Sequence, residues 1–403
     1  MKSLRNFLDR IKPNFEKGGK LQMFHSSFEA FESFLFVSDK VTSRGTHIRD
    51  SIDLKRTMTV VIIALMPAFL FGMWNVGYQH TVAFGLTDWT FWQIFGFGAL
   101  RVMPIVIVSY VVGLGIEFAF AQVRHHEVNE GFLVTGMLIP LVMPVDVPLW
   151  MVGVATAFAV IIGKEVFGGT GMNIFNPALL ARAFLFFAYP SKMSGEIVWI
   201  AGLGEKGAHM VDGFSGATPM AIAATGTGAV GHTMSVDQLM GHMPSASDMF
   251  LGFIPGSIGE TSTLAILLGA IILIATGVGS WKIIVATVTG GLGMGLLLNL
   301  AGANPYMELP AYYHLIMGGF AFGAVFMATD PVSGSQTETG KWIYGFLIGV
   351  MAVLIRVLNP AYPEGMMLAI LLMNTFAPLI DYYIVQSNVK RRLRRAKVLS
   401  KTL

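Results

Sequence analysis

A run of small residues at positions 212–220 presents one hydroxyl group suited to chemistry. The run is Asp-Gly-Phe-Ser-Gly-Ala-Thr-Pro-Met, in which Thr218 stands directly before a proline. A turn of this composition exposes such a hydroxyl, and small neighbours let a bulky group approach the backbone closely. Because loops of this kind are common, the local pattern alone favours an ordinary turn over a modification site.

Carboxylates within or beside apolar stretches form a second set of candidates. A charge at bilayer depth is costly, so its presence usually marks a pathway, a partner or an interior cavity. Glu117 follows two glycines in a long apolar stretch, and Asp330 directly precedes Pro331, where a helix break frees backbone carbonyls. Asp381 lies in the last apolar stretch and Glu29 precedes the first. Hard cations prefer such oxygens, although helix capping or a salt bridge to another subunit also explains these residues.

Three arginines, Arg101, Arg182 and Arg356, are predicted to lie at membrane depth. Arg182 is set among aromatic residues, namely Phe184, Phe186, Phe187 and Tyr189. An arginine over aromatic rings suits a flat cofactor or a quinone. The structural alternative is pairing with Glu165 or with a lipid phosphate.

The composition indicates that these residues are held by a membrane protein. The 403 residues are 54% hydrophobic and 13% charged, with a mean hydropathy of +0.64, whereas soluble domains carry about 25% charged residues. Cysteine is absent, which excludes disulfides, thiolate-bound zinc and cysteine-ligated iron–sulfur clusters within this chain. An electron carrier here must therefore be organic or belong to a partner.

Hydropathy predicts an all-α protein of about ten transmembrane helices, each needing about 20 apolar residues. The third and fifth stretches are short enough to be re-entrant or half helices. The predicted ranges are 57–77, 94–121, 131–144, 147–166, 176–190, 263–279, 283–302, 313–329, 342–358 and 364–386.

The distribution of charge predicts the orientation. Of the 27 Lys and Arg residues, 18 lie in residues 1–56 and 390–401, so the positive-inside rule places both termini in the cytoplasm. The basic tail is expected to anchor the last span, not to bind nucleic acid. The same rule places residues 191–262 outside, which puts Thr218 in the outer compartment.

Five regions follow from this layout. Two five-helix membrane halves of inverted orientation are expected, with broken helices and a substrate path where they meet; the alternative is that polar and proline breaks recur in any helix bundle. The regions are an N-terminal part with an amphipathic helix (1–56), the first half (57–190), the outer segment (191–262), the second half (263–386) and the basic tail (387–403).

Longer motifs bring in a family resemblance. The run Ser215-Gly-Ala-Thr218 resembles the flavinylation motif shared by the B-type subunit of the sodium-translocating NADH:quinone reductase and the corresponding Rnf subunit. The longer N-terminal region, with Phe15-Glu-Lys-Gly-Gly-Lys20, resembles the quinone reductase subunit more than the Rnf subunit. Other runs similar to the quinone reductase subunit are His126-Glu-Val-Asn-Glu-Gly-Phe132, Lys164-Glu-Val-Phe-Gly-Gly-Thr-Gly171, Asn176-Pro-Ala-Leu179, Arg182-Ala-Phe-Leu-Phe-Phe-Ala-Tyr-Pro190, Ile254-Pro-Gly-Ser-Ile-Gly-Glu260, Phe326-Met-Ala-Thr-Asp-Pro-Val-Ser333 and Arg356-Val-Leu-Asn-Pro-Ala-Tyr-Pro-Glu-Gly-Met-Met367.

The resemblance implies specific roles for residues of this chain. Thr218 would carry FMN through its phosphate, with Ser215, Gly216 and Ala217 beside it. Sodium uptake or conduction would involve carboxylates, the candidates being Glu29, Glu117, Asp330 and Asp381. A non-covalent riboflavin is expected near the cytoplasmic side, the candidates for its walls being Gly168, Gly169, Gly171, Asn173 and Asn176. Arg182 is the candidate for holding a ring cofactor or a quinone.

The resemblance also implies the setting. Such a subunit works in the bacterial inner membrane within a six-subunit complex, passes electrons to ubiquinone and leaves NADH oxidation to a partner. A channel or secondary transporter without redox activity, or an Rnf-type subunit, is the alternative. The Gly-x-Gly-x-x-Gly run at 202–207 lies outside any βαβ unit, so it is not expected to bind a dinucleotide.

Overall fold

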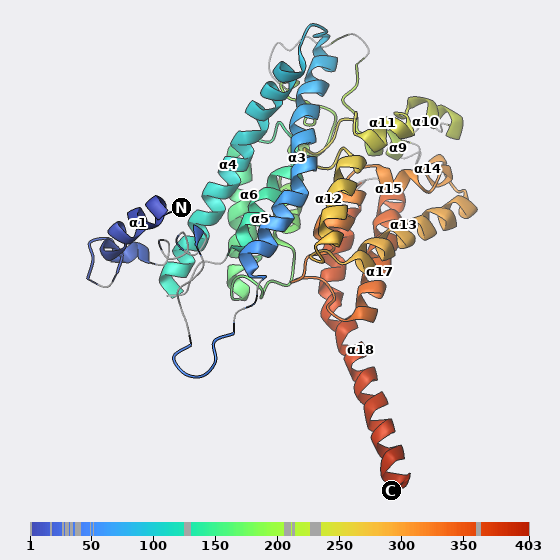
Figure 1. Ribbon diagram of the computed structural model, residues 1–403. Coiled ribbons are helices and arrows are strands. Elements are labelled where there is room, and N and C mark those ends of the chain that lie inside the picture. Colours follow the sequence, from blue (N-terminus) through green and yellow to red (C-terminus); the bar gives the residue numbers. More distant parts are fainter. Residues whose placement is uncertain are drawn as a thin grey trace.

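The computed structural model describes residues 2–16, 18–25, 28, 32, 35–36, 42–48, 50, 52–124, 130–204, 211, 214–225, 235–359 and 364–402, and this part of the chain contains helices without strands (Figure 1). The five longest helices are α3 (Leu54–Phe84), α4 (Phe91–Arg124), α13 (Trp281–Ala301), α17 (Glu338–Leu358) and α18 (Met366–Thr402). Shorter apolar helices are α5 (Gly131–Leu141), α6 (Leu149–Ile161), α7 (Pro177–Ala188) and α12 (Thr263–Ala275).

These helices confirm a multi-pass membrane protein. Within the described residues, six helical segments are long and apolar enough to cross a bilayer, and three shorter apolar helices accompany them. All ten apolar stretches predicted from hydropathy contain helix, and the third and fifth are short, as expected. The inverted relation between the two halves stays a prediction.

Two stretches differ from the expected continuous spans. The sixth, α12, ends at Ala275 because Gly277 follows in the left-handed region, with φ of +73°. The eighth is broken into α15 (Tyr313–Ile316), α16 (Phe320–Phe322) and a π-helix (Gly323–Met327). Gly318, with φ of +58°, lies at the first break, a conformation that other residues rarely adopt.

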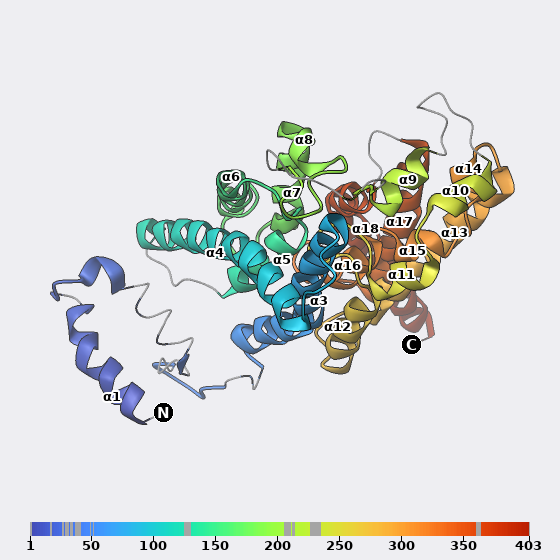
Figure 2. The same ribbon diagram turned by 90° about the horizontal axis from the view of Figure 1, so that it is seen from above.

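The two halves lie beside each other, and the outer segment covers one end of the bundle. Figure 2 shows α3 to α7 grouped on one side and α12 to α18 on the other, with α3 packed against α12. The small helices α9 (Pro219–Thr225), α10 (Val236–His242) and α11 (Ala246–Leu251) lie at the end of the bundle opposite the C-terminus (Figure 1). The predicted amphipathic helix is present as α1 (Lys2–Ile11), set apart from the bundle.

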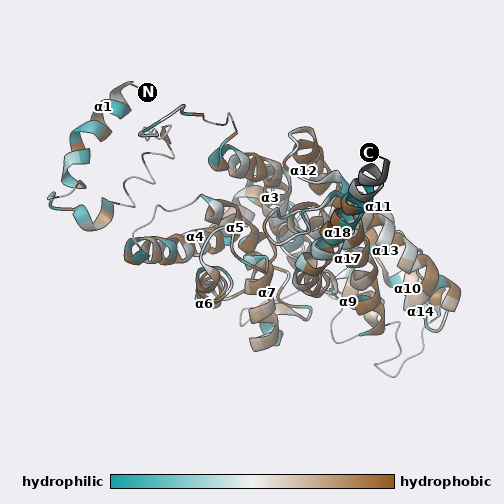
Figure 3. Cartoon of the chain, turned by 90° about the horizontal axis from the view of Figure 1, so that it is seen from below, coloured by the Kyte–Doolittle hydropathy of each residue, from teal (hydrophilic) through white to brown (hydrophobic). Residues whose placement is uncertain are grey.

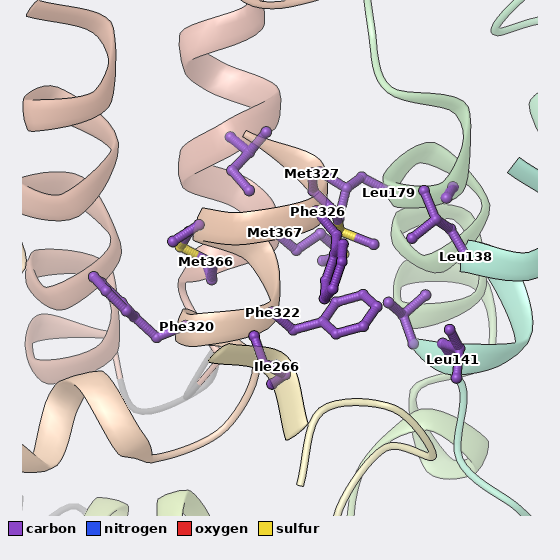
Figure 4. Packing of buried hydrophobic residues seen from close by; sticks show 14 of the residues in the cluster. Leu138, Leu141, Leu179, Ile266, Phe320, Phe322, Phe326, Met327, Met366 and Met367 are labelled. Carbon is purple, nitrogen blue, oxygen red and sulfur yellow. The ribbon is translucent and has the colours of Figure 1, made fainter. Parts of the chain in front are cut away.

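Apolar side chains fill the region where the halves meet. The membrane helices are mostly apolar, whereas α1 is largely polar (Figure 3). In the interior, Phe322 and Phe326 from the eighth stretch point toward Leu138 and Leu141 of α5 (Figure 4). Leu179 of α7 completes this apolar layer, of which Leu138 and Phe326 line one of the cavities described below.

Glycines bring α13 and α17 into close contact. A Cβ added at Gly290 of α13 would lie 2.2 Å from the carbonyl oxygen of Phe346, and one added at Gly349 of α17 would lie 2.1 Å from that of Thr287. Membrane helices associate through such close approaches because lipid supplies no hydrophobic driving force between them. The second half is therefore built on a tight α13–α17 pair.

Replacing Gly290 with alanine tests this packing. The new methyl group would collide with the Phe346 carbonyl, so we expect a loss of about 1–3 kcal/mol in stability, seen as a lower Tm of the purified protein. Gly293 lies on the same helix with nothing within 4 Å of an added Cβ, so Gly293→Ala is the matched control. Equal Tm values for the two variants would contradict the close contact.

Candidate functional site

Thr218 begins helix α9. Its Oγ1 accepts a hydrogen bond from the backbone N–H of Ala221 at 3.2 Å, and its carbonyl accepts one from Ile222 at 3.0 Å. The side chain is half-buried and lines a cavity. A threonine that caps a helix in this way has its hydroxyl in a fixed place while a lone pair and the proton stay available.

The small residues before Thr218 have a structural reason. Gly216 is buried, and a Cβ there would lie 2.3 Å from the carbonyl oxygen of Glu196. Only glycine therefore lets this loop rest on the 194–204 segment. Ser215 is exposed, and its Oγ accepts a hydrogen bond from the N–H of Ala217 at 3.3 Å. The motif thus forms a compact loop that ends in the threonine.

The cavity beside Thr218 has an apolar wall and a charged floor. Its volume is about 60 Å³, so it holds at most a few water molecules. The wall includes Phe186, Met193 and Trp199. The polar lining residues are Ser194, Thr218, Ser257, Glu260, Thr261 and Glu364.

The floor of this outer cavity is a buried ion cluster centred on Arg182. The guanidinium of Arg182 donates to Glu260 at 2.6 Å, to Ser257 at 3.2 Å and to the carboxylate of Glu364. Only 3% of Arg182 is exposed. Because a buried charge requires compensation, this one side chain ties α7 to the loop before α12 and to the turn before α18.

This arrangement corrects one expectation for Arg182. The structural alternative from the sequence, pairing with Glu165, is wrong, since Glu165 accepts from Arg124 at 2.9 Å. The carboxylate partners of Arg182 line the cavity beside Thr218. Arg182 therefore belongs to the outer site, and its predicted part in holding a ring cofactor or a quinone stays a prediction.

A second cavity, of about 100 Å³, lies on the other side of the apolar layer. Asn173, Asn176, Lys164 and Asp330 line it together with apolar residues such as Phe326. Two predicted groups, the amides expected for riboflavin and a carboxylate expected for sodium, therefore meet around one inner cavity.

The amides beside the inner cavity are held by the local backbone. Asn176 caps α7, with its Oδ1 accepting from the N–H groups of Ala178 at 3.0 Å and Leu179 at 3.3 Å. Asn173 donates to the carbonyl of Phe175 at 2.9 Å. The predicted glycines at 168 and 169 adopt φ of +119° and +99° in the same loop but do not line the cavity.

Glu117 is one half of a buried ion pair. Its carboxylate accepts from the ammonium of Lys164, and each side chain is 5% exposed. The pair joins α4 to the loop after α6, and Lys164 also lines the inner cavity. The charge of Glu117 is thus neutralised by a residue of the cavity wall, whereas Glu117 itself does not line the cavity. Its predicted part in sodium conduction remains a prediction.

Asp330 lies between the inner cavity and a neighbouring one that is lined by Lys282, Glu338 and Lys341. Its carboxylate accepts from the hydroxyl of Ser333 at 2.7 Å and from the N–H of Val332 at 3.2 Å. Desolvation raises the pKa of the Asp330 carboxyl above its ordinary value, while these hydrogen bonds act against that shift. Its predicted part in sodium uptake stays a prediction.

Asp381 has the contacts of a capping residue. It accepts from Ser335 at 2.6 Å, from the N–H and hydroxyl of Thr337 at 3.0 and 2.6 Å, and from the N–H of Gln336 at 2.7 Å. These bonds attach α18 to the turn between Asp330 and α17. Glu29, the fourth predicted carboxylate, lies outside the described residues.

Comparison with known proteins identifies the family. The model of the NQR2, RnfD, RnfE family matches residues 41–390. The chain belongs to this family. It is 49% identical over 97% of its length to a protein of Ectopseudomonas mendocina, of which the match covers 99%, and 48% identical with the same coverage to one of Azotobacter vinelandii. A protein of Chromohalobacter salexigens is 47% identical over 97% of this chain and 96% of its own length. All three are named as the B-type subunit of a Na(+)-translocating NADH-quinone reductase.

Sequence reasoning about this family member missed the carboxylates of the outer cluster. Glu260 and Glu364 were visible only as parts of longer motifs, although each follows a turn at the outer end of a predicted span. One signal could have found them: an arginine at membrane depth needs carboxylate partners that lie on the same side of the bilayer. Their contacts with Arg182 span 78 and 182 residues, so sequence proximity could not reveal them.

Removing Arg182 should be strongly destabilising. Arg182→Met leaves two carboxylates facing a buried cavity, and breaking a buried ion pair from one side costs about 3–5 kcal/mol. The triple variant Arg182→Met/Glu260→Gln/Glu364→Gln removes the charges together and should recover much of that loss. Thermal denaturation of the purified protein measures both, and a triple variant no more stable than the single one would contradict this role.

Proposed function

We propose that this chain is the B-type membrane subunit of a sodium-translocating NADH:quinone reductase. Full-length similarity to proteins of that name supports the assignment, as does the multi-pass helical fold. The family model also covers Rnf subunits, but the relatives matched over the full length bear the quinone reductase name. NADH oxidation would belong to another subunit of the complex.

The subunit would lie in the bacterial inner membrane with its basic ends in the cytoplasm. Thr218 lies at the end of the bundle opposite the basic C-terminus (Figure 1). By the positive-inside rule, that end faces the periplasm. The inner cavity and Asp330 then open toward the cytoplasm.

One observation carries the flavin proposal: the motif threonine holds a fixed, half-buried hydroxyl at the mouth of a cavity. We propose that this hydroxyl is esterified by the phosphate of FMN. The loop suits the group, because Thr218 is half-buried and directly follows the small residue Ala217, which is itself only partly buried. The cavity of about 60 Å³ is too small for the flavin ring, so the ring would extend along the outer face. When bound, FMN supplies a carrier for electrons arriving from a partner.

Riboflavin is proposed to bind at the inner cavity, whose volume of about 100 Å³ would take only part of the molecule, so that the rest would extend beyond the cavity. Apolar walls with a few fixed polar groups suit a flat heteroaromatic ring, and Asn173 and Asn176 provide amides at this wall. The carboxylate of Glu117 would hold the ammonium group of Lys164 in place beside that ring. Ubiquinone is expected to receive the electrons, and other subunits to deliver them.

Sodium is proposed to enter at Asp330 and leave past the outer cavity. Asp330 lines the inner cavity and also the neighbouring cavity that Lys282, Glu338 and Lys341 line. A carboxylate is a suitable ligand for a hard cation. The apolar layer around Phe322 and Phe326 separates this entrance from the outer ion cluster. A pump requires such a barrier, because an open polar path would dissipate the gradient.

Flavin fluorescence of the denatured subunit tests the attachment site. With the flavin transferase co-expressed, we expect the wild-type band to fluoresce under ultraviolet light and Thr218→Val to lose the signal entirely. Thr225→Val is the matched control, since Thr225 lies on the same short helix and its hydroxyl donates to the carbonyl of Ile222 at 2.6 Å. Fluorescence that survives in Thr218→Val would disprove the assignment.

Sodium stimulation of quinone reduction tests the entrance. Asp330→Asn should raise the half-saturating sodium concentration about tenfold, equivalent to about 1.4 kcal/mol of binding, with the flavin still attached. The exposed residue Asp237 of the outer segment provides the control variant Asp237→Asn. Because the Asp330 pKa is raised, acidification should protonate the carboxylate and increase the sodium requirement in the wild type but not in Asp330→Asn. Equal pH dependence would contradict the entrance.

A further inference from the structure

The segment that carries Thr218 packs against the eighth membrane stretch at its break, between α15 and α16. Met220, two residues after Thr218, is 4% exposed. A Cβ added at Gly318 would lie 1.9 Å from the sulfur of Met220. The methionine therefore packs directly against the bare backbone of Gly318, a space called the notch below, and would have to shift if residue 318 carried a side chain. The positive φ of Gly318, +58°, shapes the same notch.

The backbone of the neighbouring Gly319 lies directly against Glu260 of the ion cluster. A Cβ there would lie 2.5 Å from Oε1 of Glu260, the oxygen to which Arg182 donates. Gly318 and Gly319 both line the outer cavity beside Thr218. The break is therefore held from two directions, by Met220 of α9 and by the carboxylate of Glu260.

The same broken stretch leads directly to Asp330. After Gly319 the chain forms α16 and then the π-helix Gly323–Met327, with Asp330 three residues beyond. A π-helix is a locally irregular turn that is frequent at functional sites. Phe322 and Phe326 in this stretch belong to the apolar layer between the two cavities (Figure 4). One short segment thus has its start beside Thr218 and its end at the inner cavity.

We infer that Met220 and Gly318 are positioning residues, which dock the Thr218 loop onto the 317–330 segment and so tie the outer site to Asp330. The inference deepens the proposed function, on which its sodium readout rests. A displacement of the Thr218 loop would act on the start of this segment through the methionine in its notch. Asp330, the apolar layer and the outer site would then move together.

A mutant cycle in the intact complex tests the inference. Gly318→Ala places a methyl group against the Met220 sulfur, so amide hydrogen exchange should rise about threefold or more in the peptide covering 319–333 as well as in the one covering 214–225. The half-saturating sodium concentration should shift by a similar factor. Gly318→Ala/Met220→Ala removes the collision, so its effect on both readouts should be smaller than the sum of the effects of the two single variants. If Gly318→Ala does not assemble, Met220→Ala alone, which empties the notch, should also raise exchange in both peptides.

Gly302→Ala is the matched control for backbone strain. Gly302 has φ of +52°, but the atom nearest an added Cβ is 3.7 Å away, so this variant carries the strain without the collision. Exchange changes confined to 214–225, or equal effects of Gly318→Ala and Gly302→Ala, would overturn the inference. Hydrogen exchange does not depend on a flavin, whereas a wild-type band without fluorescence would reject the proposed function alone.

Discussion

The buried guanidinium of Arg182 is the constraint on which the outer half of this protein depends. A cation at 3% exposure within an apolar bundle persists only with charged partners, and here the partners come from two distant parts of the chain. Satisfying one charge therefore fixes three segments: α7, the loop before α12 and the turn before α18. Those segments form the floor of the cavity at whose mouth Thr218 lies.

The molecule places polar groups at two levels and separates them with an apolar layer. At one level are Thr218 and the Arg182 cluster; at the other are Asn173, Asn176, the Lys164–Glu117 pair and Asp330. Two cofactor sites and a cation entrance can be distributed over these levels without an open path between them. We propose that coupling between the levels comes from the broken stretch from Met317 to Asp330, because Gly318 and Gly319 line the outer cavity and Phe326 and Asp330 line the inner one.

The sequence predicted the elements better than the contacts. Apolar stretches and basic ends were enough to predict a multi-pass helical protein, and the shortness of α5 and α7 followed from the lengths of their stretches. The break at Gly318 was not predictable in the same way, because a glycine in an apolar stretch usually serves helix packing. Its left-handed conformation is seen together with Met220, nearly a hundred residues earlier.

The candidate site shows the same division. Thr218 was identified through a motif, and helix α9, which it directly precedes, lies at the end of the bundle opposite the C-terminus; which side of the membrane that end faces stays a prediction. The carboxylates were identified by type alone, which could not distinguish Glu117 in a buried pair from Asp330 beside two cavities. Hydropathy ranks residues by depth, whereas pairing depends on which helices become neighbours.

Mass spectrometry of the motif peptide tests the central claim most directly. Chymotryptic cleavage after Phe214 of the subunit, taken from the native complex, releases a peptide that begins at Ser215 and contains Thr218. We expect this peptide to be heavier by one flavin mononucleotide joined with loss of water, and fragmentation to locate the addition on the threonine. A peptide of unmodified mass from the active complex would contradict the account.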